Sequence, residues 1–166
     1  MMGKTFKAAG IAAFIGMGAS PLFAHADSTA MSGYLEKDGY EAACLAIRDA
    51  STIAAQALEK DGQPETDEEL EALRTGLFYA AQNTAAEIEG TDGAGDRDRA
   101  MAAALGLMAA DRELLDTHLQ MSDKMGGSPE AIGDALGKTC NDFQSDQYKR
   151  NLALQVLVVY ERLFKA

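Results

Sequence analysis

Apolar side chains recur along this sequence with the period of an α-helix, and this spacing constrains the fold more than any other feature. Over residues 40–58 the charged residues lie outside the apolar face of such a helix. The stretch "KDGQPE" ends the helix, because Gly62 favours a helix stop and Pro64 follows. The spacing therefore predicts a helix over residues 40–60, with one face made of Tyr40, Cys44, Ile47, Ser51, Ala54 and Leu58.

Three further helices are predicted from their starts. Thr66, with Glu69 three residues later, forms a capping box that opens a helix ending near Glu89. A third helix is expected from Asp96 to Leu119. Ser128 caps a short fourth helix, which Gly133 and Gly137 weaken by about 1 kcal/mol each relative to alanine.

The last segment, "NLALQVLVVYERLFKA", fits both an alternating strand and a helical stripe. A lone strand is unstable, and no second strand candidate exists to pair with it. The segment is therefore predicted to be a helix. Because it is apolar on nearly every side, it is expected at the centre of the fold.

These elements predict an all-α fold, a compact antiparallel bundle of four to five helices in a single domain over residues 27–166. The short connections between helices make consecutive helices the expected antiparallel neighbours. Residues 27–38 form a polar lead-in that is expected to be loose or partly helical.

The N-terminus has the three-part layout of a secretory signal peptide. Lys4 and Lys7 precede an apolar run, and Ala24 and Ala26 occupy the positions that a signal peptidase reads. At about 18 Å as a helix, the apolar run is too short for a membrane core of about 30 Å. We therefore expect residues 1–26 to be removed near Ala26 and the rest to be periplasmic or secreted, with no stable membrane anchor.

Cys44 and Cys140 are the two cysteines of the chain. They are too far apart for a redox or haem-attachment motif, and a pair in an oxidising compartment usually forms a disulfide. A bridge here closes a loop of about 97 residues and contributes about 4–5 kcal/mol in the chain-entropy model. The predicted bridge is structural, not catalytic.

The chain carries a formal charge of −11, which becomes −13 once Lys4 and Lys7 leave with the signal. Such a charge disfavours nucleic acid and anionic lipid, both of which require basic patches. It favours solubility and a basic or amphipathic protein partner.

Two groups of residues are weak candidates for a divalent cation. Asp92, Asp96 and Asp98 surround a glycine-rich turn, although Asp96 is more simply the cap of the third helix. Asp111 and His118 fall on one face of that helix, but a zinc site would need further ligands from elsewhere. His118 is more simply a residue near the negative end of the helix dipole.

Other chemistries find little support. Haem ligation by His118 with Met31, Met101 or Met121 is conceivable in a bundle, but these methionines are better explained as core residues. "GDALGKT" lacks the spacing of a phosphate-binding loop, and no catalytic constellation can be assembled. The sequence thus favours an exported, non-enzymatic helical protein that binds a partner protein, of which immunity-type inhibitors are one kind. The alternative is a periplasmic carrier of a metal or small ligand, and no other cofactor is expected.

Overall fold

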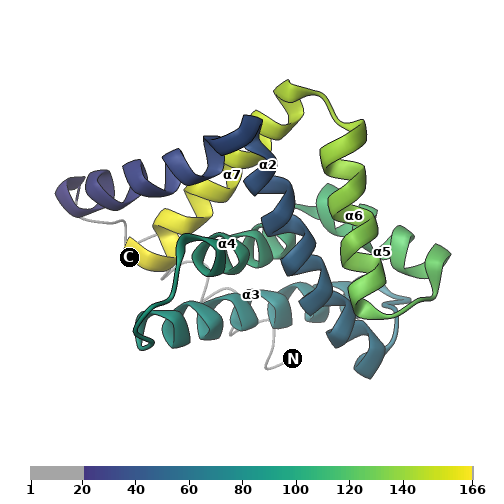
Figure 1. Ribbon diagram of the computed structural model, residues 1–166. Coiled ribbons are helices and arrows are strands. Elements are labelled where there is room, and N and C mark those ends of the chain that lie inside the picture. The colour runs from purple at the N-terminus through teal and green to yellow at the C-terminus, as the bar shows by residue number, and fades with distance from the viewer. Residues whose placement is uncertain (1–20, 166) are drawn as a thin grey trace.

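The computed structural model describes residues 21–165, which form α-helices and no β-strand (Figure 1). The all-α prediction is confirmed, but the number of four to five helices is wrong. Asp111, with an extended backbone, divides the predicted third helix into two. The six helices are α2 (Pro21–Asp61), α3 (Asp67–Glu89), α4 (Asp96–Ala110), α5 (Arg112–Met125), α6 (Pro129–Phe143) and α7 (Asp146–Lys165).

Helix α2 is two helices joined by a sharp turn, which is visible in Figure 1 as a bend in the long helix. Asp38, Gly39 and Tyr40 have φ angles of 53°, 72° and 71°, so three successive residues are left-handed. The lead-in predicted to be loose or partly helical is helical up to this turn, and the predicted helix over residues 40–60 follows it.

Several helix ends follow the sequence signals. The Glu69 amide donates to Thr66 Oγ1 over 3.1 Å, and the Thr66 amide donates to Glu69 Oε2 over 3.3 Å, which confirms the capping box. Gly62 is left-handed, with φ of 82°. Ser128 caps α6, and its hydroxyl accepts from the Ala131 amide. The short polar stretches between apolar runs therefore act as the turns of the fold.

Helix α4 is the central helix of the molecule, contacting α2, α3 and α7. Every residue from Ala102 to Ala109 is buried, because its alanines allow neighbouring backbones to approach closely. The expectation that the last helix is the central one is wrong. Helix α7 packs on α2 and α4 but leaves Leu154 and Val158 about half exposed, at 53% and 46%.

Consecutive helices are not always neighbours, contrary to the expected arrangement. Helix α2 packs against α6, α7 and α4 and makes almost no direct contact with α3, although α2 and α3 are consecutive. The close contact between α2 and α6 depends on two glycines of α6. A Cβ atom on Gly133 would lie 2.1 Å from Thr52 Oγ1, and one on Gly137 would lie 2.7 Å from Arg48 Cβ. These two glycines let α6 lie directly on α2.

The Cys44–Cys140 disulfide joins α2 to α6 within this close contact, with 5.5 Å between the two Cα atoms. The predicted pairing of the two cysteines is therefore present in the structure. The predicted leader lies mostly outside the described residues, and its cleavage near Ala26 stays a prediction. Within residues 21–165, no helix combines the length and the apolarity needed to cross a bilayer.

Two alanine substitutions at helical glycines should have opposite effects on stability, because one glycine lies in the contact between α6 and α2 and the other has open space around it. Gly133→Ala would force α6 away from Thr52 and should lower the free energy of unfolding by about 1–3 kcal/mol. Gly76→Ala, on the exposed side of α3 with open space around it, should raise it by about 1 kcal/mol. Urea unfolding of both variants measures the difference. Equal effects would contradict the close packing.

Candidate functional site

A groove of about 520 Å³ lies between α2 and α6, with Cys44 of the disulfide in its lining. We call it the cysteine groove. Nine of its thirteen lining residues are charged or polar, and the other four are apolar or small. Its lining residues are Tyr34, Lys37, Asp38, Glu41, Ala42, Cys44, Leu45, Arg48, Asp134, Gly137, Lys138, Asn141 and Asp142.

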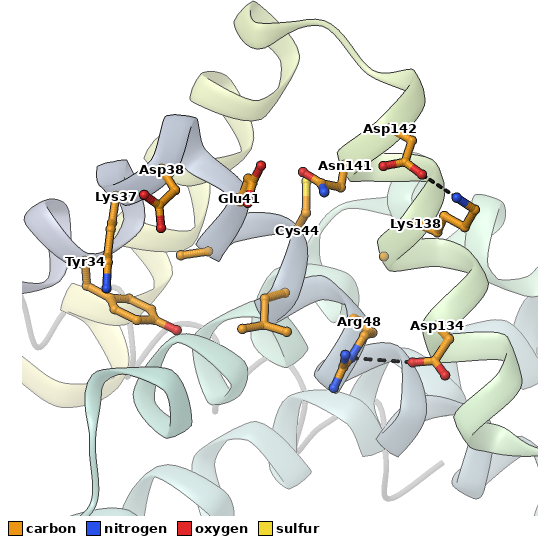
Figure 2. A pocket seen from close by; sticks show the side chains of 13 residues that line it. Tyr34, Lys37, Asp38, Glu41, Cys44, Arg48, Asp134, Lys138, Asn141 and Asp142 are labelled. Atoms are coloured by element: carbon orange, nitrogen blue, oxygen red, sulfur yellow. Dashed lines mark hydrogen bonds and ion pairs between the residues drawn. The ribbon is translucent and has the colours of Figure 1, made fainter.

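The two walls carry charges of both signs. Figure 2 shows Lys37, Asp38 and Glu41 on the α2 side, near the turn, and Lys138 and Asp142 on the α6 side. With Arg48 and Asp134, the lining holds four acids and three bases. Such a surface suits a charged or amphoteric ligand better than an apolar one.

The charges on α6 are paired, whereas the two carboxylates near the turn of α2 are not. Lys138 bonds to Asp142, and Arg48 Nε lies 3.6 Å from Asp134 Oδ1 (Figure 2). Among the described residues, Asp38 and Glu41 make no ion pair or side-chain hydrogen bond. Their carboxylates are therefore free to accept from a bound molecule.

Two uncharged groups add to this set. The Oδ1 atom of Asn141 is buried and has no hydrogen-bond partner. A buried acceptor left unpaired costs about 1–3 kcal/mol, so a donor that reached it would relieve that cost. Burial raises the pKa of Tyr34 further above neutral pH, and its hydroxyl can donate a hydrogen bond.

The left-handed turn contributes Asp38 to the lining of the groove. A left-handed backbone is costly for a bulky residue such as Tyr40, at about 1–3 kcal/mol. Tyr40 packs against the core, which holds the turn in place. Such strain concentrates at binding sites, because the surrounding structure must hold a fixed geometry there.

The predicted aspartate site on the glycine-rich turn does not assemble. Asp98 accepts from the Gly95 amide, and Gly95, not Asp96, is the cap of α4. Asp96 lies 4.0 Å from Arg99, and Asp92 is exposed. Across residues 21–165, no three His, Cys, Asp or Glu side chains are grouped as metal ligands would be.

The predicted pair of Asp111 and His118 does not form a common site either, because the two side chains have different partners. Asp111 caps α5, accepting from the Leu114 amide, while His118 is fully buried further along the helix. His118 Nδ1 lies 2.6 Å from Ser51 Oγ on α2, and its Nε2 has no partner. Burial lowers the pKa of His118 to about 4, so the ring is neutral at pH 7. Because α5 continues to Met125, His118 lies near the middle of the helix, and the interpretation of His118 as a residue near a helix end is wrong.

The Ser51–His118 pair resembles part of a nucleophilic site but is enclosed. Both side chains have no exposed surface, and neither lines the cysteine groove. A serine nucleophile needs access to substrate and a base that a third group orients. The pair therefore acts in the described structure as a buried link between α2 and α5.

Sequence reasoning missed the groove, although two signals pointed to it. The Asp38–Gly39 dipeptide is a turn signal inside a helical stretch. Gly133 and Gly137 lie one helical turn apart, a spacing that marks a close approach, and Cys140 follows on the same helix. Neither signal identifies Asn141 or Glu41, because their neighbours come from the other helix.

Comparison with protein-family models, with curated proteins and with solved structures finds no significant match for this chain. The chemistry of the groove therefore rests on its own residues.

Proposed function

We propose that this chain is an exported, non-enzymatic binding protein whose cysteine groove holds a basic segment of a partner protein. The observation that carries the proposal is the two unpaired carboxylates in the groove, those of Asp38 and Glu41, on a wall opposite Asn141, whose Oδ1 is buried without a hydrogen-bond partner. A lysine or arginine side chain supplies the donors that these oxygens lack.

The overall charge supports the same kind of partner. A net charge of −11 attracts a basic protein at long range and speeds its encounter, while the groove supplies the specific contacts. An inhibitor or immunity-type protein that neutralises a basic exported toxin belongs to this class. Location in the periplasm rests on the predicted leader, and the disulfide supports an oxidising compartment.

The test compares two variants that remove the same charge. Asp38→Asn/Glu41→Gln alters the groove, and Glu87→Gln/Asp123→Asn alters exposed carboxylates on α3 and α5. The wild-type chain captures partners from a periplasmic extract, and the purified partner is then titrated against each variant by calorimetry. We expect the groove variant to bind at least about tenfold more weakly, a loss of about 1.4 kcal/mol, and the control to change little.

Salt provides the second criterion. The affinity of the wild type for the partner should fall as sodium chloride rises from about 50 to about 500 mM, because salt screens the attraction between exposed charges. Binding that ignores salt, or equal losses in the two variants, would remove the proposal.

A carrier of a small ligand is the second candidate, and the size of the groove favours it. About 520 Å³ lies within the range of small-molecule sites, about 300–1,000 Å³, and charges of both signs suit an amphoteric molecule. Thermal melts with arginine, lysine and a diamine test this candidate. Metal analysis of the purified protein and melts with Ca²⁺ and Zn²⁺ test the cation alternative. A shift that vanishes in the Asp38→Asn/Glu41→Gln variant would favour a small ligand over a protein.

A further inference from the structure

A second groove, of about 500 Å³, lies between α2 and α3 on residues that do not line the cysteine groove. It exists because these two helices are consecutive in the chain and yet barely touch. We call it the apolar groove. Ile53 and Ala57 of α2 form one wall, and Leu73, Gly76, Leu77 and Ala80 of α3 form the other.

We propose that the apolar groove binds an amphipathic α-helix of a partner protein, with lysine or arginine at one end of that helix. The walls are helices, whose backbone groups are already paired within each helix. A bound strand would therefore find no backbone partners, whereas a bound helix satisfies its own. An apolar helix face against these aliphatic walls is the occupant that leaves no buried polar group unpaired.

Gly76 supports a close approach from outside. It sits within α3, is exposed, and a Cβ atom there would meet nothing within 4 Å. Glycine within a helix costs about 1 kcal/mol relative to alanine, and no contact in the described chain requires it here. A partner helix lying directly on α3 at this point would require it, as α2 requires Gly133 of α6.

The acidic residues of the groove indicate which end of the partner helix carries the basic residues. The lining of the apolar groove contains two acids, Asp61 and Glu69, and no base. Both lie near the loop that closes one end of the groove, where α2 ends and α3 begins. Lysine or arginine on the partner helix would meet these carboxylates, which fixes its direction in the groove.

The test uses synthetic helical peptides and the purified protein. The probe is a fluorescent sixteen-residue alanine- and leucine-based peptide with three lysines at one end. One control peptide carries glutamates in place of the lysines, and another carries a central proline that breaks the helix. We expect the lysine peptide to bind at least about tenfold more tightly than either control by fluorescence anisotropy.

Two glycine variants locate the binding. Gly76→Leu fills the apolar groove, and Gly33→Leu makes the same change at another exposed helical glycine with open space around it. Gly76→Leu should weaken binding at least about tenfold, while Gly33→Leu should not. Asp61→Asn should reduce both affinity and its salt dependence. Thermal melts verify that all variants fold.

Several results would overturn the proposal. They are the absence of binding by the lysine peptide, equal binding by the glutamate or proline peptide, and equal losses in the two leucine variants. Sedimentation equilibrium supplies a further result that would overturn it. If the protein self-associates and Gly76→Leu abolishes this association, the apolar groove binds a second copy of this chain. None of these results bears on Asp38 and Glu41, so the two grooves are tested separately.

Discussion

We expect the Cys44→Ala/Cys140→Ala variant to lose about 4 kcal/mol of its free energy of unfolding. The bridge joins residues 96 positions apart, so it removes much of the freedom of the unfolded chain. The midpoint of thermal unfolding should fall on the order of 10 °C for a domain of this size. Urea unfolding of the variant and the wild type measures the loss.

Reduction of the wild type with dithiothreitol serves as the control, because it opens the bridge without changing the sequence. It should reproduce most of the loss, and the alanine variant should not respond to dithiothreitol. A loss below about 1 kcal/mol by both routes would show that packing of α6 on α2, not the bridge, holds the two helices together.

Acid should destabilise the protein through His118. Its pKa is about 4 in the folded chain, against an ordinary value of 6.5, so the unfolded chain binds the proton more readily between these values. The stability contributed by the neutral ring is therefore complete above about pH 6.5 and is lost as the pH falls towards 4. The loss amounts to about 3 kcal/mol, measured as the difference in urea unfolding at pH 7 and pH 4.

The double variant Ser51→Ala/His118→Leu isolates this effect. Replacing both partners with apolar groups leaves no unpaired atom, so the fold should tolerate the change at pH 7. All other ionisable groups are the same in the two proteins, so the difference between them belongs to His118. Equal losses of stability from pH 7 to pH 4 in wild type and variant would contradict the buried pair.

Local structure was largely predictable from the sequence, because its causes lie within a few residues. The capping box at Thr66 and the stop at Gly62 are examples in which side chain and backbone meet inside one turn. The disulfide was also predictable, because the chain offers one possible pairing of two cysteines.

Long-range packing was not predictable from the same patterns. The apolar stripe of the last helix indicates that this face is buried but not which helix covers it. Helix α4 lies at the centre instead, because its alanines allow closer packing. The Ser51–His118 bond joins residues 67 positions apart, and no spacing rule connects them. The groove acceptors Glu41 and Asn141 come together only because Gly133 and Gly137 let α6 reach α2.

Asp111 shows a local error with a local cause. Apolar residues continue on both sides of it, so the period alone predicts one helix through this point. Its side chain instead accepts from the Leu114 amide and starts a new helix, a competition with the backbone that is typical of aspartate. A residue that favours caps can therefore divide an otherwise continuous apolar stripe.

The covalent bond between the walls of the cysteine groove has a consequence for how a guest enters and leaves. Because Cys44 and Cys140 tether α2 to α6, the two walls cannot swing apart as a hinge would allow. A guest of the proposed kind would therefore meet two walls that are already fixed relative to each other, and little ordering of the protein is left for the binding step. Under the proposed function, recognition is thereby tied to thiol oxidation, because the bond that fixes the two walls forms only when both thiols are oxidised.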